Sequence, residues 1–205
     1  MVRTLLVDLD GVIRLWHQQE DPAAEASFGL PPGSVRRVAF APERLQPAIT
    51  GRIRDEVWRA QIRDQLALEF PGADAAGAVA WWSAPCGEVD RAALELIAAC
   101  RARAAVVLVT NATSRLPDDL RRLGLDGAFD HVVNSSVVGA AKPDPAIFRA
   151  ALAAAGVAAP EEALFIDDTP GHVEAARRLG IAGHHYVGPE ALRDELRALG
   201  LLSHP

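Results

Sequence analysis

The amino-acid sequence predicts an α/β fold, in which a doubly wound parallel sheet carries an inserted α-helical cap. From residue 90 onward, short apolar segments typical of buried strands alternate with segments of helical pattern. This alternation is typical of a parallel sheet with helices on both faces. Residues 4–8 form an earlier apolar segment, and residues 14–88 between the two parts have helical patterns without a convincing buried strand. A single helical insertion after the first strand accounts for this arrangement.

The predicted strands are short apolar runs. Residues 104–109 and 163–166 are continuously apolar, which is typical of strands that are buried on both faces of a sheet. Residues 131–133 and 184–187 are shorter candidates. In chain order, the expected strands are therefore 4–8, 104–109, 131–133, 163–166 and 184–187.

Several predicted helices carry recognisable start and stop signals. Asp144-Pro145 and Thr169-Pro170 each place a potential capping side chain before a proline at the first helical position. Gly124 and Gly180 follow helical segments, where glycine commonly ends a helix. The expected helices are 54–69, 73–82, 114–123, 144–155, 170–179 and 189–198.

The insertion divides the chain into two predicted domains. Residues 1–14 and 89–205 are assigned to the α/β core, and residues 15–88 to a helical cap. Ligands of open α/β sheets bind beyond the carboxyl ends of the strands, so a helical lid over those ends is expected. Loops are predicted at four prolines of the cap, Pro31, Pro32, Pro42 and Pro47.

Composition limits the classes of partner. Half of the 205 residues are apolar and 23% are charged, and the net charge is −6. This is the balance of a soluble globular protein without the basic surface expected of a nucleic-acid-binding protein. Arginine pairs at 36–37, 121–122 and 177–178 are predicted near helix ends or on solvated faces.

The sequence also argues against export and membrane insertion. No segment is long and apolar enough to span a bilayer, and the N-terminal apolar run is too short for a signal peptide and ends in acids. Cys86 and Cys100 are too few for a disulfide framework and lack metal-ligand spacing. A cytoplasmic protein that acts on a small molecule, with no membrane partner, is therefore expected.

Polar residues stand where the predicted strands end. Asp8-Leu9-Asp10-Gly11 follows the first strand, Thr110-Asn111 follows a second, and Asp167-Asp168-Thr169 follows a third. Lys142 precedes a predicted helix and is the single lysine, the other 20 of the 21 basic residues being arginine. Each group alone is typical of a turn or a helix cap. Together they predict a site at one edge of the sheet.

These residue types indicate phosphate chemistry. Neighbouring carboxylates raise one another's pKa unless a cation lies among them. Oxygen ligands without histidine or cysteine favour magnesium. Magnesium beside a lysine can neutralise the oxygens of a phosphoryl group during its transfer.

The motifs resemble the four ordered motifs of the haloacid-dehalogenase (HAD) superfamily of hydrolases. The resemblance rests on Asp8 to Ile13, Thr110-Asn111, Lys142-Pro143 and Phe165 to Asp168. It covers the predicted core and implies a Rossmann-like fold. The position and helical pattern of the insertion resemble the first cap class of that superfamily. Phosphatases, β-phosphoglucomutases and haloacid dehalogenases share this layout.

The resemblance implies a role for each motif residue. Asp8 would be the nucleophile that forms an aspartyl-phosphate. Asp10 would protonate the leaving alcohol and then activate water, which requires the two carboxyls to differ in protonation. Thr110 and the backbone of Asn111 would hold phosphoryl oxygens. Lys142 would bridge the nucleophile and the phosphate.

The resemblance also implies a magnesium site. Asp168 and Asp8 would bind the ion together with the backbone carbonyl of Asp10, and Asp167 would stand beside it, directly or through water. Family members often carry a further Asp or Asn where this sequence has His172. We expect His172 to lie in the first turn of its helix without a metal role.

Asp10 separates some of the related activities. Haloacid dehalogenases lack an acid at this position and need no metal, so the sequence favours a phosphatase acting on a small monoester such as a sugar phosphate or nucleotide. A phosphomutase uses the same two acids and stays open as an alternative. A receiver-like signalling protein or a non-catalytic binding protein would be the alternative from another class, although a receiver places its acids in a different order.

The cap is expected to recognise the leaving group of the substrate. Arg14 and Trp16 are the first candidates, because the chain has barely left the catalytic loop there. Tryptophans of a small helical cap more often form its core. The weaker candidates are His17, Trp58, Arg59, Trp81 and Trp82.

Overall fold

The computed structural model describes residues 1–16 and 22–203, and a five-stranded sheet forms its centre. The strand order is β5-β4-β1-β6-β7, and all neighbours are parallel. The predicted α/β fold with a parallel sheet is therefore confirmed. The strands are β1 (Thr4–Val7), β4 (Ala105–Thr110), β5 (His131–Asn134), β6 (Ala163–Asp167) and β7 (Ala182–His185).

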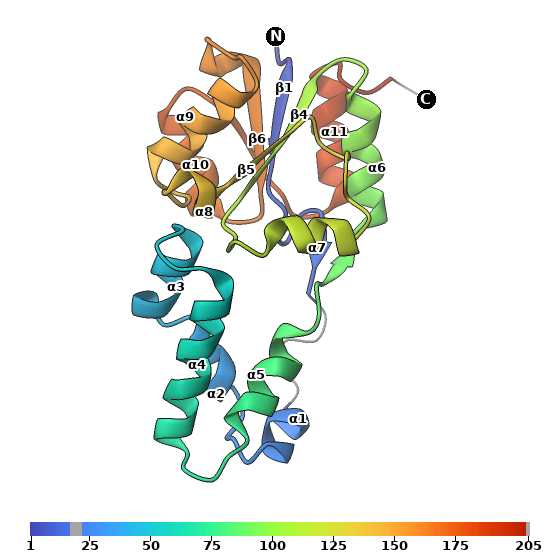
Figure 1. Cartoon of the computed structure of the whole chain (residues 1–205). Helices are drawn as coiled ribbons and strands as arrows, with labels where there is room; N and C mark the ends of the chain where they lie inside the picture. The colour runs from blue at the N-terminus through green and yellow to red at the C-terminus, as the bar shows by residue number, and fades with distance from the viewer. Residues whose placement is uncertain (17–21, 204–205) are drawn as a thin grey trace.

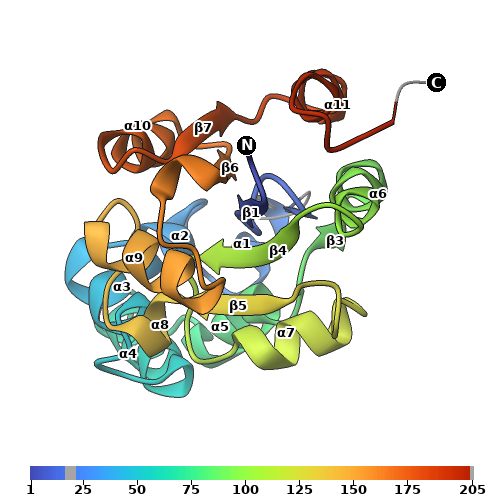
Figure 2. The same cartoon turned by 90° about the horizontal axis from the view of Figure 1, so that it is seen from above.

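Helices cover both faces of this sheet, as Figures 1 and 2 show. On one face pack α6 (Arg91–Cys100), α7 (Leu116–Arg122) and α11 (Pro189–Ala198). On the other lie α8 (Ser135–Val138), α9 (Pro145–Ala154) and α10 (Pro170–Arg178). A 3-10 turn, Pro160–Glu162, precedes β6.

Alternating side chains of the strands supply both cores. Leu5 and Val7 of β1 belong to the core under α6 and α11, whereas Leu6 belongs to the core under α9. Successive strand residues point to opposite faces, so a sheet covered twice needs apolar residues at every position. In the second core, the rings of Phe148 and Phe165 meet edge to face with centroids 5.1 Å apart.

The segment between β1 and the rest of the sheet is helical and has its own apolar cluster. Its two later helices lie close to the predicted ranges, but the three earlier ones were not predicted. The loops predicted at Pro42 and Pro47 are wrong, because Pro42 opens α3 and Pro47 lies within it. Proline fits the first helical turn, where its missing N–H has no partner to lose. The helices are α1 (Pro22–Ser27), α2 (Ser34–Ala39), α3 (Pro42–Ile49), α4 (Asp55–Glu69) and α5 (Ala75–Ser83).

A small antiparallel ribbon marks both ends of this helical segment. Arg14–Leu15 (β2) pairs with Glu88–Val89 (β3), with Arg14 opposite Val89. The ribbon lies close to the boundaries predicted for the cap. The assignment of residues 15–88 as a separate domain stays a prediction.

The predicted helix signals are confirmed with one exception. Asp144 caps α9, because its side chain accepts a hydrogen bond from the Ala146 N–H. Gly124 and Gly180 follow their helices with φ angles of 67° and 83°. The prediction for Thr169 is wrong: its hydroxyl contacts Asp168 at 3.2 Å and makes no cap bond to α10.

The arginine pairs lie where they were expected, in the last turns of α2, α7 and α10. None of the helices in the described part of the chain combines the length and apolar character that a membrane crossing requires.

Candidate active site

The carboxyl ends of β1, β4 and β6 meet at one edge of the sheet. Val7 is in register with Leu108 of β4 and with Ile166 of β6, so the polar residues that follow these strands converge. They surround a cavity of about 570 Å³. The predicted site residues that line it are Asp8, Asp10, Trp16, Thr110, Asn111, Lys142 and Asp168.

Lys142 joins two of the acids beneath this cavity. Its Nζ lies 2.7 Å from Asp8 Oδ1 and 2.7 Å from Asp167 Oδ2. All three residues are buried, and Asp167 is fully so. A buried charge is tolerated when it is paired and hydrogen-bonded, and here one ammonium serves two carboxylates.

Two buried carboxylates share one ammonium, and the pKa values of all three groups shift accordingly. Burial raises the pKa of Asp8 to about 7; Lys142 opposes the rise, and Asp167 adds to it. Burial also acts to raise the pKa of Asp167, but hydrogen bonds from His172 and Lys142 hold it below its usual value. Burial acts to lower the pKa of Lys142, and the two carboxylates raise it nonetheless. A bound cation would favour the ionised form of Asp8.

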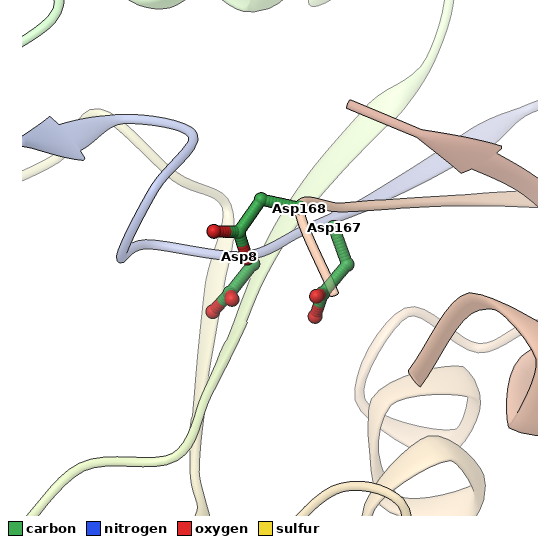
Figure 3. A group of neighbouring side chains, drawn as sticks. All are labelled: Asp8, Asp167 and Asp168. Carbon is green, nitrogen blue, oxygen red and sulfur yellow. The ribbon is translucent and has the colours of Figure 1, made fainter. Parts of the chain in front are cut away.

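Three carboxylates lie close enough to hold a metal ion. One oxygen each from Asp8, Asp167 and Asp168 lies within 4.8 Å of the others, and Figure 3 shows the three side chains gathered at the ends of β1 and β6. An all-oxygen set fits magnesium. Among the described residues, the carboxylate of Asp10 is not part of this group. A contribution from the Asp10 carbonyl stays a prediction.

Asp167 differs from the other two acids in its partners. Its Oδ1 accepts a hydrogen bond from the Thr169 N–H at 2.8 Å, and its Oδ2 accepts one from Lys142. His172, in the first turn of α10, places Nδ1 3.2 Å from both oxygens. Asp8 and Asp168 are therefore better placed as metal ligands, whereas Asp167 orients Lys142.

Asp10 is held by two neighbours on its own loop. Arg14 donates from Nε to Asp10 Oδ1 at 2.6 Å and from a terminal nitrogen to Oδ2 at 2.8 Å. The indole N–H of Trp16 donates to Oδ1 at 2.6 Å. Arg14 is buried and also pairs with Asp119 of α7 at 3.3 Å. Both oxygens of Asp10 thus accept from Arg14, a contact that the motif alone could not reveal.

Thr110 and Asn111 take different positions at the end of β4. The Thr110 hydroxyl is buried and is without a hydrogen-bond partner among the described residues. The Asn111 side chain exchanges two hydrogen bonds with the backbone of Lys142, at 2.7 and 2.9 Å. Because buried hydroxyls normally find a partner, Thr110 has the character of a group that binds a ligand.

Gly11 allows the metal-site acids to approach the loop after β1. Its φ is 78°, and a Cβ at this position would lie 2.1 Å from Asp168 Oδ2. Asp168 therefore occupies the space that any side chain at position 11 would need.

We expect Gly11→Ala to weaken magnesium binding by about 10–100-fold, as displaced supporting groups commonly do. The backbone strain of an alanine at positive φ adds about 1–2 kcal/mol of destabilisation. Isothermal titration calorimetry with MgCl2 measures the affinity. Gly124→Ala is the matched control, because φ is 67° there and nothing lies within 4 Å of the new Cβ. Equal affinity loss in both variants would contradict the role given to Asp168.

A second cavity, of about 340 Å³, lies between the helical segment and the core. Of the cap candidates, Arg14, Trp16, Trp58, Arg59 and Trp82 line it. Trp81 instead packs near Phe28, with ring centroids 6.3 Å apart, and His17 lies outside the described residues.

Sequence reasoning missed two wall residues, Arg36 and Phe40, which line both cavities. Arg36 lies in α2, and Phe40 follows the last residue of that helix. Residues four apart share one helix face, but nothing in the sequence showed that this face lies against the edge of the sheet that carries Asp8.

Comparison with the sequences of known proteins identifies relatives of this chain among the hydrolases. The sequence matches the family of haloacid dehalogenase-like hydrolases over residues 2–180. It is 30% identical over 173 residues to haloacid dehalogenase-like hydrolase domain-containing protein 3 of Homo sapiens, covering 83% of this chain and 64% of that protein. It is 44% identical over 79 residues to a phosphoserine phosphatase of Thermus thermophilus, covering 38% of this chain and 31% of the relative. The chain thus spans less than two thirds of the length of these curated relatives.

Solved structures share the fold at low sequence identity. A HAD-family enzyme of Bacteroides thetaiotaomicron, in complex with magnesium and inorganic phosphate, superposes with a TM-score of 0.68 at 22% identity, covering 90% of this chain and 93% of the other. An L-2-haloacid dehalogenase of Xanthobacter autotrophicus superposes with a TM-score of 0.65 at 20% identity, covering 99% of this chain and 85% of the other.

Proposed function

The chain belongs to the haloacid dehalogenase-like hydrolases, and on that premise we propose that it is a magnesium-dependent phosphatase of small phosphate monoesters. The observation that carries the proposal is the surroundings of Asp8. Asp8 contacts the ammonium of Lys142 and lies near the carboxylates of Asp167 and Asp168, and Asp10 follows two residues later. A nucleophilic carboxylate, a buried cation and a second acid are the groups that phosphoryl transfer requires.

The proposed reaction has two steps on Asp8. A carboxylate oxygen of Asp8 attacks phosphorus and forms an acyl phosphate, while the bond from phosphorus to the ester oxygen breaks and Asp10 gives that oxygen a proton. Asp10 then takes a proton from water, which attacks phosphorus and releases inorganic phosphate and free Asp8. Lys142, the Thr110 hydroxyl and the Asn111 backbone hold the phosphoryl oxygens. Magnesium, held by Asp8 and Asp168, would supply further positive charge against these oxygens.

The structure adds one requirement to this scheme. Asp10 can donate a proton only from an oxygen that carries one, yet both of its oxygens accept hydrogen bonds from Arg14. Protonation of Asp10 must therefore weaken these contacts, because it removes the negative charge that the guanidinium of Arg14 pairs with. The pairing of Arg14 with Asp119 keeps the guanidinium close by when that happens.

Phosphate release from a panel of esters tests the proposal. The panel contains p-nitrophenyl phosphate, sugar phosphates, nucleotides and short acid phosphates, each assayed with magnesium and with EDTA. We expect release that depends on magnesium. Isomerisation of a sugar phosphate without release would indicate a phosphomutase, and a lasting phosphoaspartate without turnover would indicate a receiver-like protein. Halide release from a 2-haloacid would contradict the assignment of Asp10.

Thr110→Val tests the phosphate contact without disturbing the fold. Valine has nearly the same shape, and the lost hydroxyl has no partner among the described residues, so the free energy of unfolding should not fall. A hydrogen bond to a charged group is worth about 1.5–3 kcal/mol, so we expect kcat/KM to fall by about 10–100-fold. Urea unfolding and steady-state kinetics measure the two effects. Loss of stability with unchanged kinetics would mean that Thr110 is structural.

A further inference from the structure

The two cavities share part of their walls around Asp10. Both are lined by Asp10, Trp16, Arg36, Phe40 and Asn111. The larger one contains Asp8 and Lys142, where the proposed function places the phosphoryl group. The smaller one extends from Asp10 toward α3, α4 and α5. Since Asp10 would protonate the leaving oxygen, the rest of the leaving group lies in the smaller cavity.

Aromatic and aliphatic side chains form much of the wall of this smaller cavity. Trp82 meets Phe40 edge to face with centroids 6.2 Å apart and Trp58 with centroids 5.7 Å apart. Leu45 and Ile49 of α3 complete this part of the wall. The two edge-to-face pairs share Trp82, and ring edges and faces favour contact with another ring.

Most of the charged groups of the same wall form ion pairs with each other, and the Nε of Arg59 is buried without a hydrogen-bond partner among the described residues. Arg14 binds Asp10 and Asp119, and Arg115 binds Asp119 at 2.9 Å. At the other side of the cavity, Asp55 pairs with Arg59 at 2.6 Å and accepts a hydrogen bond from Thr113 at 2.8 Å.

A leaving group rich in hydroxyls would have to replace these contacts, because each of its polar groups needs a partner once it leaves water. The wall carries four arginines and three aspartates, which leaves one net positive charge and disfavours a cationic leaving group.

From these contacts we propose that the leaving group of the substrate is a small, flat and largely apolar alcohol that carries an aromatic ring. The cavity volume of about 340 Å³ lies at the small end of the range for ligand pockets, about 300–1,000 Å³, and suits one or two rings. Sugar phosphates are poor substrates on this view. The proposal rests on the phosphatase function and adds the class of substrate to it.

The test compares esters whose leaving alcohols have similar acidity, so that intrinsic reactivity does not decide the result. We expect kcat/KM for 2-phenylethyl phosphate to exceed that for glucose 6-phosphate and glycerol 3-phosphate by at least about 10-fold, the effect of filling an apolar pocket. Equal or higher values for the two polyol phosphates would overturn the proposal.

Two adjacent tryptophans provide matched variants. Trp82 lines the cavity, whereas Trp81 on the same helix packs near Phe28, and both are partly buried. Trp82→Leu should lower kcat/KM for 2-phenylethyl phosphate by about 10-fold more than that for glycerol 3-phosphate, and Trp81→Leu should change neither. Should Trp82→Leu fail to fold, Phe40→Leu takes its place, because Phe40 is 42% exposed. Equal effects of the position 81 and position 82 variants would overturn the proposal.

Binding separates this inference from the proposed function. The non-hydrolysable 2-phenylethylphosphonate, titrated calorimetrically in the presence of magnesium, should bind at least about 10-fold more tightly than methylphosphonate. Should no ester be hydrolysed, the phosphatase function fails, and the phosphonate comparison alone decides the inference. Equal affinities of the two phosphonates would contradict it.

Discussion

Asp8→Asn is expected to lower phosphate release by at least about 10⁴-fold, because the amide cannot attack phosphorus and nucleophile loss is among the largest single effects in enzymes. The variant should fold normally. Burial raises the pKa of Asp8 to about 7, so the ionised group is disfavoured in the folded state and a neutral side chain of the same shape is tolerated. Lys142 keeps Asp167 as its partner at 2.7 Å.

Steady-state assays with saturating magnesium, together with urea unfolding in EDTA, measure both effects of this substitution. Asp64→Asn serves as the control, since Asp64 is an exposed acid on α4 that pairs with the neighbouring Arg63. Activity of Asp8→Asn above about one per cent of the parent would exclude Asp8 as the nucleophile.

Lys142→Met is expected to harm stability and activity together. The change leaves Asp8 and Asp167 buried without their shared cation, and breaking a buried pair commonly costs about 3–5 kcal/mol. Loss of the ammonium should also lower kcat/KM by about 10²–10³-fold, as for other groups that stabilise charge in the transition state. Urea unfolding gives the first effect, and phosphate release gives the second.

A double variant separates the charge effect from the loss of packing. In Lys142→Met with Asp167→Asn, one of the two uncompensated charges is gone, so the double variant should be more stable than the sum of the single changes predicts. Activity should stay low, because the phosphoryl oxygens still lack the lysine. Strict additivity of the two stability changes would mean that Lys142 does not compensate Asp167.

The parallel sheet and the edge that carries the candidate site could be predicted from the sequence. The apolar pattern of each strand and the alternation of strands with helices along the chain predict the same fold. Short, valine-rich apolar runs such as 104–109 are typical of buried strands, and the polar residues that end them lie at one edge when the strands are parallel. The single lysine gave a further marker, and Lys142 lies between two of the predicted acids.

The helical segment was predicted less well, for a physical reason. Pro42 and Pro47 were interpreted as loop residues, yet both lie in α3. Proline fits the first helical turn, where Pro42 lies, but the sequence does not show where that turn falls. Pro47 lies in the helix interior, which proline ordinarily disfavours, so its presence argued against a helix there.

The contacts of Asp10 were also beyond the sequence. Arg14 and Trp16 were candidates because of their position in the chain, and that they contact the substrate stays a prediction. Both line the smaller cavity. They also bind Asp10, and Asp119 of α7, distant in sequence, completes the group. A salt bridge between residues 105 positions apart depends on tertiary packing, for which one sequence carries no signal.

The small ribbon of β2 and β3 has an evolutionary consequence. Because Arg14 stands opposite Val89, the two ends of the helical segment lie side by side, and a longer or shorter segment between them changes the entropy of loop closure only slightly. The segment that carries Trp82 can therefore be exchanged, extended or shortened while the register of β1 with its neighbours is preserved. Mutation and recombination can alter that segment without touching Asp8, so one catalytic scaffold can be reused with many different lids.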